Sequence, residues 1–337
     1  MMTPRVAAIH DMSGFGRCSL TVAIPILSAM GVQCCPLPTA FLSTHTGGFE
    51  GFTFLDMTDE MSKVADHWAS LGLTFQAVYS GFLGSERQIG VVENFICRFR
   101  GPDTVVVVDP VMGDYGRVYQ TYTAAMCSGM ARLAELADVI TPNLTEAALL
   151  LGQPYETLPA GEAGLREITE RLSLGGRRSV VLTGASLAPG RTGAVCFDAR
   201  TGKTEAVQTA YVAHEFHGTG DVFSSVLTGA LVRGESLSSA AGEAAGELPA
   251  VLLQKRRAAL LPGILIPADD HGMAVLPQIE DAGIRRDRIG QVLLQREVMI
   301  RIGVVRAEGQ QLPDHARVHL RMGLRAACTS SGRPICA

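Results

Sequence analysis

The sequence predicts an α/β fold in which helices cover both faces of a mainly parallel sheet. Strand-like and helix-like segments alternate along the chain with short connections, as they do in that fold class. Four consecutive valines, Val105 to Val108, indicate a strand that is buried on both faces, which is typical of parallel sheets. The sequence contains neither GxGxxG nor GxxxxGK(S/T), so neither a dinucleotide fold of that kind nor a P-loop kinase is indicated.

Apolar runs and glycine stops define the expected elements in order. The expected strands are residues 6–9, 32–37, 77–84 (running into a Gly turn), 105–109, 138–141 and 179–183, then a hairpin of 194–197 with 204–207. The expected helices are residues 19–30, 56–71, 86–99, 122–136, 146–151, 161–175 and 222–231, and one that begins at Leu237. Loops are expected at 10–16 and 41–49, and Asn143 with Glu146 predicts a capping box.

Composition and charge narrow the class of protein. The chain has 337 residues, 47% of them hydrophobic, a net charge of −4 and a pI of about 6.1. It carries no general basic field, which argues against nucleic acid or an acidic membrane as a main partner. No run of about 18 apolar residues and no signal-peptide pattern is present, so we expect a cytoplasmic protein. The eight cysteines form no CxxC, and we expect free thiols.

Polar residues follow several of the expected strands. Asp11 and Ser13 come after the first strand, and Asp109 ends the valine strand directly before Pro110. In open α/β sheets the carboxyl edge of the strands holds the ligand site, whereas helix capping is an equally good explanation for Asp11 and Ser13. The expected loop at 41–49 is rich in hydroxyls, His and Gly, which suits a flat heteroaromatic ligand and equally an ordinary surface loop.

The stretch from His217 to Phe223 carries the most specific chemistry. Gly218, Thr219 and Gly220 form a small-residue turn before an apolar pattern with helical spacing, and Asp221 falls in the first helical turn. A helix N-terminus with glycines is an anion site, because its backbone N–H groups are unbonded and a glycine lets the anion approach closely. An Asp held there can accept a proton from a hydroxyl that attacks phosphorus; a simple capped helix is the alternative.

The motifs together resemble the pyridoxal kinase branch of the ribokinase-like superfamily. The matching segments occur in the family's order over residues 5 to about 242: residues 9–16 (IHDMSGFG), 43–46 (STHT), 80–85 (SGFLGS), 109–113 (DPVMG), 141–146 (TPNLTE) and 218–221 (GTGD). The resemblance implies a three-layer α/β/α sandwich. It also implies transfer of the ATP γ-phosphoryl group to the 5′-hydroxymethyl group of a B6 vitamer, in a protein that is often a homodimer.

The resemblance also implies a role for each candidate residue. Asp221 would be the base, and Gly218, Thr219 and Gly220 the anion hole. Asp109 and Glu146 would hold Mg²⁺ with ATP, as hard oxygen ligands do. Further ATP-side positions would be Thr141, Asn143, Thr183 and His217. The vitamin-side positions would be Asp11, Ser13, His45, Thr46 and Gly47.

Two departures from the family pattern stand out. Thr183 occupies a position where some relatives carry Lys. Residues 245–337 do not match the two orderly helices that usually finish the fold, because regular patterning is lost around 246–249 and Arg and Pro become frequent. We therefore expect a kinase domain over 1–245 that extends to about 300, an atypical region over 245–337, and disorder over 305–337.

Two other functions compete with the first. The related hydroxymethylpyrimidine kinases share the Asp chemistry, but their first loop characteristically reads as a Gly-Ser-Asp-Ser-Ser-Gly-Gly-like run, and here it reads His-Asp-Met-Ser-Gly-Phe-Gly. A non-catalytic vitamin- or nucleotide-binding relative is the second alternative, favoured by the unusual C-terminal region.

Overall fold

The computed structural model describes residues 3–46, 49–212 and 217–259, which all belong to the compact unit of residues 1–273. Its strands are β1 (Arg5–Phe15), β2 (Gln33–Thr44), β3 (Phe54–Asp56), β4 (Ala77–Ser80), β5 (Val105–Val108), β6 (Gly113–Asp114), β7 (Arg117–Val118), β8 (Val139–Ile140), β9 (Ser179–Thr183), β10 (Arg191–Asp198) and β11 (Lys203–Ala210). Its helices are α1 (Leu20–Ala29), α2 (Thr58–Ser70), α3 (Glu86–Phe99), α4 (Ala124–Glu135), α5 (Leu144–Leu151), the 3-10 turn η1 (Tyr155–Thr157), α6 (Gly161–Leu172), α7 (Thr219–Val232) and α8 (Leu237–Ala259).

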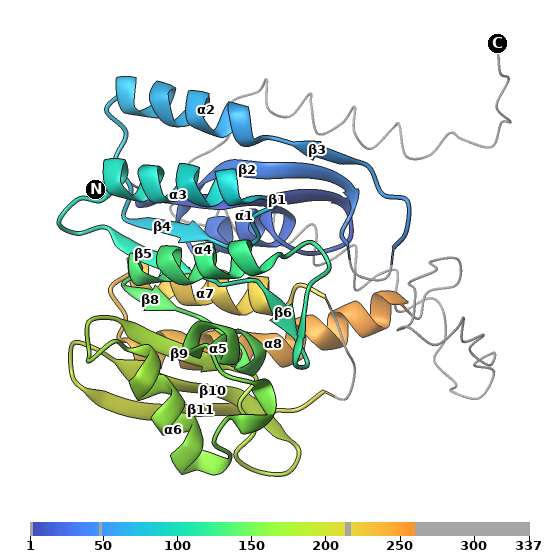
Figure 1. Cartoon of the computed structure of the whole chain (residues 1–337), viewed down its shortest axis with the longest axis vertical. Coiled ribbons are helices and arrows are strands. Elements are labelled where there is room, and N and C mark those ends of the chain that lie inside the picture. Colours follow the sequence, from blue (N-terminus) through green and yellow to red (C-terminus); the bar gives the residue numbers. More distant parts are fainter. Residues whose placement is uncertain (1–2, 47–48, 213–216, 260–337) are drawn as a thin grey trace, which may run out of the picture. The chain divides into compact units, whose positions relative to one another are not determined.

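A nine-stranded sheet of order β11-β10-β9-β8-β5-β4-β1-β2-β3 forms the middle layer (Figure 1). The six strands from β9 to β2 in this order run parallel. The remaining strands, β3, β10 and β11, each pair antiparallel with their neighbours and complete the two sides of the sheet. The predicted mainly parallel sheet is therefore confirmed, and the predicted hairpin corresponds to β10 and β11.

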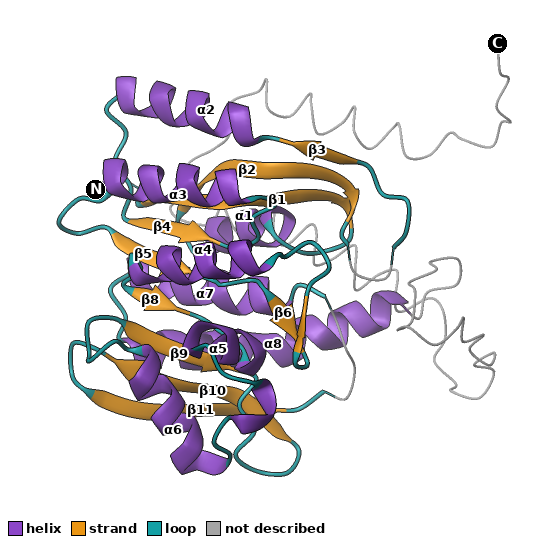
Figure 2. Ribbon diagram, viewed as in Figure 1, coloured by secondary structure: helices purple, strands orange, loops and turns teal. Residues whose placement is uncertain are grey.

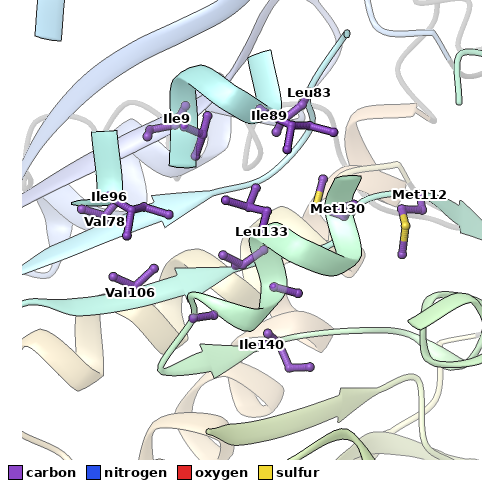
Figure 3. Close-up of a cluster of buried hydrophobic side chains, with 14 of the residues drawn as sticks. Ile9, Val78, Leu83, Ile89, Ile96, Val106, Met112, Met130, Leu133 and Ile140 are labelled. Carbon is purple, nitrogen blue, oxygen red and sulfur yellow. The ribbon is translucent and has the colours of Figure 1, made fainter. Parts of the chain in front are cut away.

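Two layers of helices cover the sheet, as Figure 2 shows by colour. One apolar core packs the sheet against α2, α3, α4, α5 and α6, and the other packs it against α1, α7 and α8. Figure 3 shows the first core, where Val78 and Val106 of the sheet meet Ile96 and Leu133 of the helices. The three-layer α/β/α sandwich is confirmed, and it leaves the strand ends as the place where polar loops gather.

Several expected boundaries were wrong. The loop expected at 10–16 is largely strand, and the first part of the loop expected at 41–49 is strand up to Thr44, because β1 and β2 continue side by side past a register shift between His10 and Met12. Strand β3 and the β6–β7 hairpin were missed, since short two- and three-residue strands carry little periodicity. Helix α8 runs to Ala259 through Gly246 and Pro249, residues whose low helix propensity predicted an earlier loss of regularity.

Further expectations concern the cysteines and membrane spans. The six cysteines within the described residues, Cys18, Cys34, Cys35, Cys97, Cys127 and Cys196, are free thiols, as expected. Among the described helices none combines the length and apolar character that a bilayer crossing requires. The expected disorder over 305–337 lies outside the described residues, and the expected domain boundaries stay predictions.

The buried amide of Gln88 connects strand β2 with the start of α2 and the segment before α3. Its Nε2 donates to the Thr39 carbonyl oxygen at 2.8 Å and to the Thr58 hydroxyl oxygen at 3.0 Å. Its Oε1 accepts from the Gly84 backbone N–H at 2.7 Å. Because Gln88 is 0% exposed, these hydrogen bonds are made away from water, and the Gly84 N–H has this side chain as its acceptor.

We predict that Gln88→Leu lowers the free energy of unfolding by about 1–3 kcal/mol, since it removes these hydrogen bonds and leaves the Gly84 N–H without that acceptor. Urea unfolding followed by circular dichroism measures the change. The matched control is Arg87→Ala on the same helix, which removes only an exposed ion pair with Asp59 and is expected to cost less than about 1 kcal/mol. Equal losses in the two variants would contradict the assigned role of Gln88.

Candidate active site

A cavity of about 520 Å³ opens at the carboxyl ends of the central strands and the start of α7. Asp109 follows β5, Thr141 follows β8 and Thr183 ends β9, so neighbouring parallel strands bring these side chains to one edge of the sheet. The predicted site residues that line the cavity are Asp109, Thr141, Asn143, Glu146, Thr183, His217, Gly218, Thr219, Gly220 and Asp221. The ATP-side and anion-hole candidates are thus brought together.

The start of α7 combines a left-handed turn with a polar first helical turn. Gly218 is the N-cap, with φ 80° and ψ 14°, and a Cβ there would lie 2.2 Å from the Arg17 carbonyl oxygen. Only glycine fits this conformation and this close approach. The first helical hydrogen bond runs from Val222 N to Gly218 O, so the N–H groups of Thr219 and Gly220 precede the bonded part of the helix. The structure therefore has the local geometry that an anion site requires.

Asp109 lies directly against this turn. A Cβ on Gly220 would be 3.8 Å from Asp109 Oδ2. Ser224, one turn further along α7, has its Oγ 3.2 Å from Asp109 Oδ2 and 3.0 Å from Thr141 Oγ1. Asp109 is 6% exposed and Thr141 is 2% exposed, so these hydroxyls supply the polar environment of the carboxylate.

Glu146 is held by the backbone at the start of α5. Its Oε2 accepts from Asn143 N at 2.8 Å, and Glu146 N donates to Asn143 Oδ1 at 2.9 Å, which is the predicted capping box. Its Oε1 accepts from Met112 N at 3.2 Å. Asn143 Nδ2 in turn donates to the Gly113 carbonyl oxygen at 2.8 Å, which attaches the β6–β7 hairpin to α5. Asn143 and Glu146 therefore cap α5 and at the same time line the cavity.

The vitamin-side candidates do not line this cavity and lie beside it. Asp11 and Ser13 are buried on β1, where Ser13 Oγ donates to Asp11 Oδ2 at 3.0 Å. His45 follows β2, and its ring lies 4.7 Å from the ring of His217. Thr46 is exposed in the same segment, and Gly47 lies outside the described residues. His45 and His217 thus bring the segment after β2 to the turn before α7.

Burial and like charge set the protonation of the acids. Burial, followed by the negative charge of Asp221, raises the pKa of Asp109 to about 7, against the opposing hydroxyls of Thr141 and Ser224. Burial, followed by the charge of Asp109, raises the pKa of Glu146 well above its usual range. Burial also raises the pKa of Asp11, while hydrogen bonds from Ser19 and Ser13 lower it. Perturbed carboxyls of this kind gather at functional sites.

The donor set suits a hard divalent cation that retains other ligands. Asp109 and Glu146 offer carboxylate oxygens, and the charge of Asp109 disfavours ionisation of Glu146, so a cation held by both would offset their repulsion. Within the described part of the chain, no group of three or more His, Cys, Asp or Glu side chains could hold a metal. Mg²⁺ usually keeps water and phosphate ligands beside one or two carboxylates, a donor set that Asp109 and Glu146 would fit.

Sequence reasoning missed several residues of the site. Ser224 lies three positions after Asp221, and that helical spacing puts both side chains on one face of α7. The sequence therefore contained the signal that Ser224 lies near the site. Ser19 bonds both Asp11 and Asp221, but 202 residues separate it from Asp221 and no local pattern reports this contact. The cavity is also lined by tyrosines from four segments, Tyr115, Tyr119, Tyr155 and Tyr211, which no motif marked.

The fold and the site together define a ribokinase-like α/β protein. The chain belongs to the phosphomethylpyrimidine kinase family, whose model matches residues 24–254. A pyridoxine/pyridoxal/pyridoxamine kinase of Bordetella avium is 30% identical over 287 residues, which cover 80% of this chain and 91% of the relative. The resemblance to pyridoxal kinases in the ribokinase-like superfamily is confirmed.

Two solved structures resemble the chain in fold and sequence. A Bacteroides thetaiotaomicron protein assigned to the phosphomethylpyrimidine kinases, in a crystal form with pyridoxal, is 44% identical with a TM-score of 0.70, over 77% of this chain and 89% of that one. Pyridoxal kinase from Lactobacillus plantarum is 27% identical with a TM-score of 0.70, over 88% of this chain and 99% of that one.

The raised pKa of Asp109 predicts a pH-dependent stability. Its carboxyl titrates near 7 in the folded protein and near 3.8 when unfolded, so the folded state binds the proton more tightly. Stability is therefore lost as the pH rises from about 4 to about 7. We expect Asp109→Asn to remove this loss and to stabilise the ligand-free protein by about 2–4 kcal/mol more at pH 8 than at pH 4.

Calorimetric melting of ligand-free wild type and Asp109→Asn at pH 4, 6 and 8 measures the effect. The control is Asp103→Asn, an exposed carboxylate remote from the cavity, for which no such growth with pH is expected. A melting-temperature difference between Asp109→Asn and wild type that stays constant from pH 4 to pH 8 would sink the prediction.

Proposed function

We propose that the chain transfers the γ-phosphoryl group of ATP to the 5′-hydroxymethyl group of pyridoxal, pyridoxine or pyridoxamine, in vitamin B6 salvage. The observation that carries this proposal is the position of Asp221 in the first turn of α7, directly after the glycine turn and on the wall of the cavity that Asp109 also lines. The named Bordetella and Lactobacillus relatives and the Bacteroides crystal form with pyridoxal support the substrate class.

In the proposed reaction, Asp221 accepts the proton of the hydroxymethyl group. The hydroxyl oxygen forms the new bond to phosphorus, the bond between phosphorus and the β-phosphate oxygen breaks, and ADP leaves. Phosphoryl transfer through a loose transition state needs little activation of the hydroxyl, so positioning and charge stabilisation contribute most of the rate. The N–H groups of Gly218, Thr219 and Gly220 would stabilise the charge on the moving group.

The remaining candidates divide between the two substrates. Asp109 and Glu146 would hold Mg²⁺, which neutralises phosphate charge when bound. Thr141, Asn143, Thr183 and His217 would face ATP. Asp11, Ser13, His45, Thr46 and Gly47 would face the vitamin. We further propose that the enzyme acts in the cytoplasm as a homodimer.

A substrate panel tests the proposed function. We expect pyridoxal, pyridoxine or pyridoxamine to give a kcat/KM at least about 10-fold above that of hydroxymethylpyrimidine with ATP and Mg²⁺, the discrimination that about 1.4 kcal/mol of transition-state binding provides. A coupled ADP-release assay on the full chain measures it. Preference for hydroxymethylpyrimidine would favour the pyrimidine kinase that the family name also covers. Absence of turnover with every substrate would leave a binding protein.

Replacing the base tests the assignment of Asp221. Asp221→Asn keeps the shape and an acceptor for Ser19 N but cannot take the proton, so we expect kcat to fall by about 10²–10⁴-fold. The dissociation constant for the vitamer, measured by titration without ATP, is expected to change little. Asp59→Asn on the exposed face of α2 serves as the control and should retain wild-type kcat. A kcat within a few-fold of wild type for Asp221→Asn would refute the assignment.

A further inference from the structure

Ser19 joins two carboxylates that are far apart in the sequence. Its backbone N–H donates to Asp221 Oδ2 at 2.8 Å, and its hydroxyl donates to Asp11 Oδ1. Ser13 Oγ donates to the other oxygen of Asp11 at 3.0 Å. Ser19 is 6% exposed and Asp11 is 5% exposed, so both bonds lie largely away from water. A single residue before α1 thus contacts the proposed base and a proposed vitamin-side acid.

The backbone of Ser19 adopts a conformation that normally requires glycine. Its φ of 51° and ψ of −131° resemble the first central position of a type II′ turn, where glycine predominates. A residue other than glycine keeps such a strained conformation only where the surrounding contacts hold it there. Strained residues of this kind cluster at functional sites. Here the conformation directs the N–H to Asp221 while the side chain reaches Asp11, and glycine would provide only the first of these bonds.

The segment that holds Ser19 also packs tightly on the turn before α7. A Cβ on Gly218 would lie 2.2 Å from the Arg17 carbonyl oxygen and 3.1 Å from Cys18 Cα, so backbone meets backbone. Cys18 is 8% exposed between these segments. Burial raises the pKa of its thiol to about 12, and the charges of Asp11 and Asp221 add to the effect, which is consistent with both acids being near. Any displacement of Ser19 would therefore reach the anion-hole turn.

We propose that Ser19 is a positioning residue, which fixes the direction of the Asp221 carboxylate and couples it to Asp11. The inference rests on the proposed function, since it assigns to Ser19 an effect on the proton acceptor of that reaction. Vitamin bound at Asp11 would hold the Ser19 hydroxyl in place, and the Ser19 N–H would then hold the base. The hydrogen bonds of Ser19 reach Asp11 and Asp221, not Asp109 or Glu146. A change at Ser19 should therefore alter vitamer binding and kcat rather than ATP binding.

Two substitutions separate positioning from a structural role. Ser19→Ala and Ser19→Gly both remove the hydroxyl, but only glycine adopts positive φ without strain. Without the bond to Asp11, alanine is expected to relax to negative φ and turn its N–H away from Asp221. We therefore expect kcat to decrease in the order wild type, Ser19→Gly, Ser19→Ala, with a loss of about 10-fold or more for Ser19→Ala, because small misplacements of reacting groups are costly.

Steady-state kinetics on the full chain provide the readouts. The KM for the vitamer should rise in both variants, and the KM for ATP should stay within about two-fold. The matched control is Thr21→Ala, which removes a neighbouring hydroxyl that donates to the Cys18 carbonyl oxygen at 2.7 Å. Its kcat should stay within about two-fold of wild type. A merely structural role of Ser19 would lower the melting temperature of both variants and leave kcat unchanged.

A double-mutant cycle with Asp11→Asn tests the coupling itself. If Ser19 acts through Asp11, the kcat of the double variant should be no lower than that of the poorer single variant. Multiplicative losses, or a kcat for Ser19→Ala equal to that of Thr21→Ala, would overturn the inference. Crystal structures of wild type and Ser19→Ala add a readout without turnover, in which the Asp221 carboxylate should be displaced in the variant. An inactive wild type would refute the proposed function, while an undisplaced Asp221 would refute the role of Ser19.

Discussion

The gathering of buried carboxylates at one edge of the sheet is the constraint on which the rest of the structure depends. Asp109 and Glu146 are each less than 10% exposed; besides burial, the charge of Asp221 raises the pKa of Asp109, and the charge of Asp109 raises that of Glu146. The backbone N–H groups of Met112 and Asn143 donate to the Glu146 carboxylate, and the hydroxyls of Thr141 and Ser224 lower the pKa of Asp109. These groups only partly compensate for the burial of the two acids. The local arrangement thus disfavours the ligand-free, fully ionised protein and favours a state in which positive charge enters the cavity.

The parallel order of the strands explains how residues from distant segments of the chain come together at one edge of the sheet. Strands β5, β8 and β9 deliver Asp109, Thr141 and Thr183 to one edge, and β1 delivers Asp11 on the same sheet. Helix α7 then closes the arrangement from the other side, because Gly218 packs on Arg17 and Ser224 reaches both β5 and β8 strand ends. The acids are held by strand ends and helix starts, which are more rigid than free loops.

Much of the fold and of the candidate site could be predicted from the sequence, since the strongest signals in the sequence are local. The valine run of β5, the capping box of Asn143 and the glycine turn before α7 each depend on neighbouring residues, and each is found as expected. What the sequence could not supply depends on contacts across long separations. The continuation of β1 and β2 past their register shift, and the bond from Ser19 to Asp221, arise only when distant segments pair.

The same reasoning explains the unexpected length of α8. Gly246 and Pro249 predict a helix end by propensity, yet propensity is a weak prior that tertiary packing overrides. Ala240, Ala241, Ala244 and Ala245 bury one side of α8 against the core that it shares with α7. Leu248, the next turn along, lines the cavity that holds Asp221 and Asp109. The region in which the sequence loses its regular pattern therefore begins as a helix, and this helix lines part of the cavity. Packing against α7, rather than local helix propensity, determines the position of this part of the cavity wall.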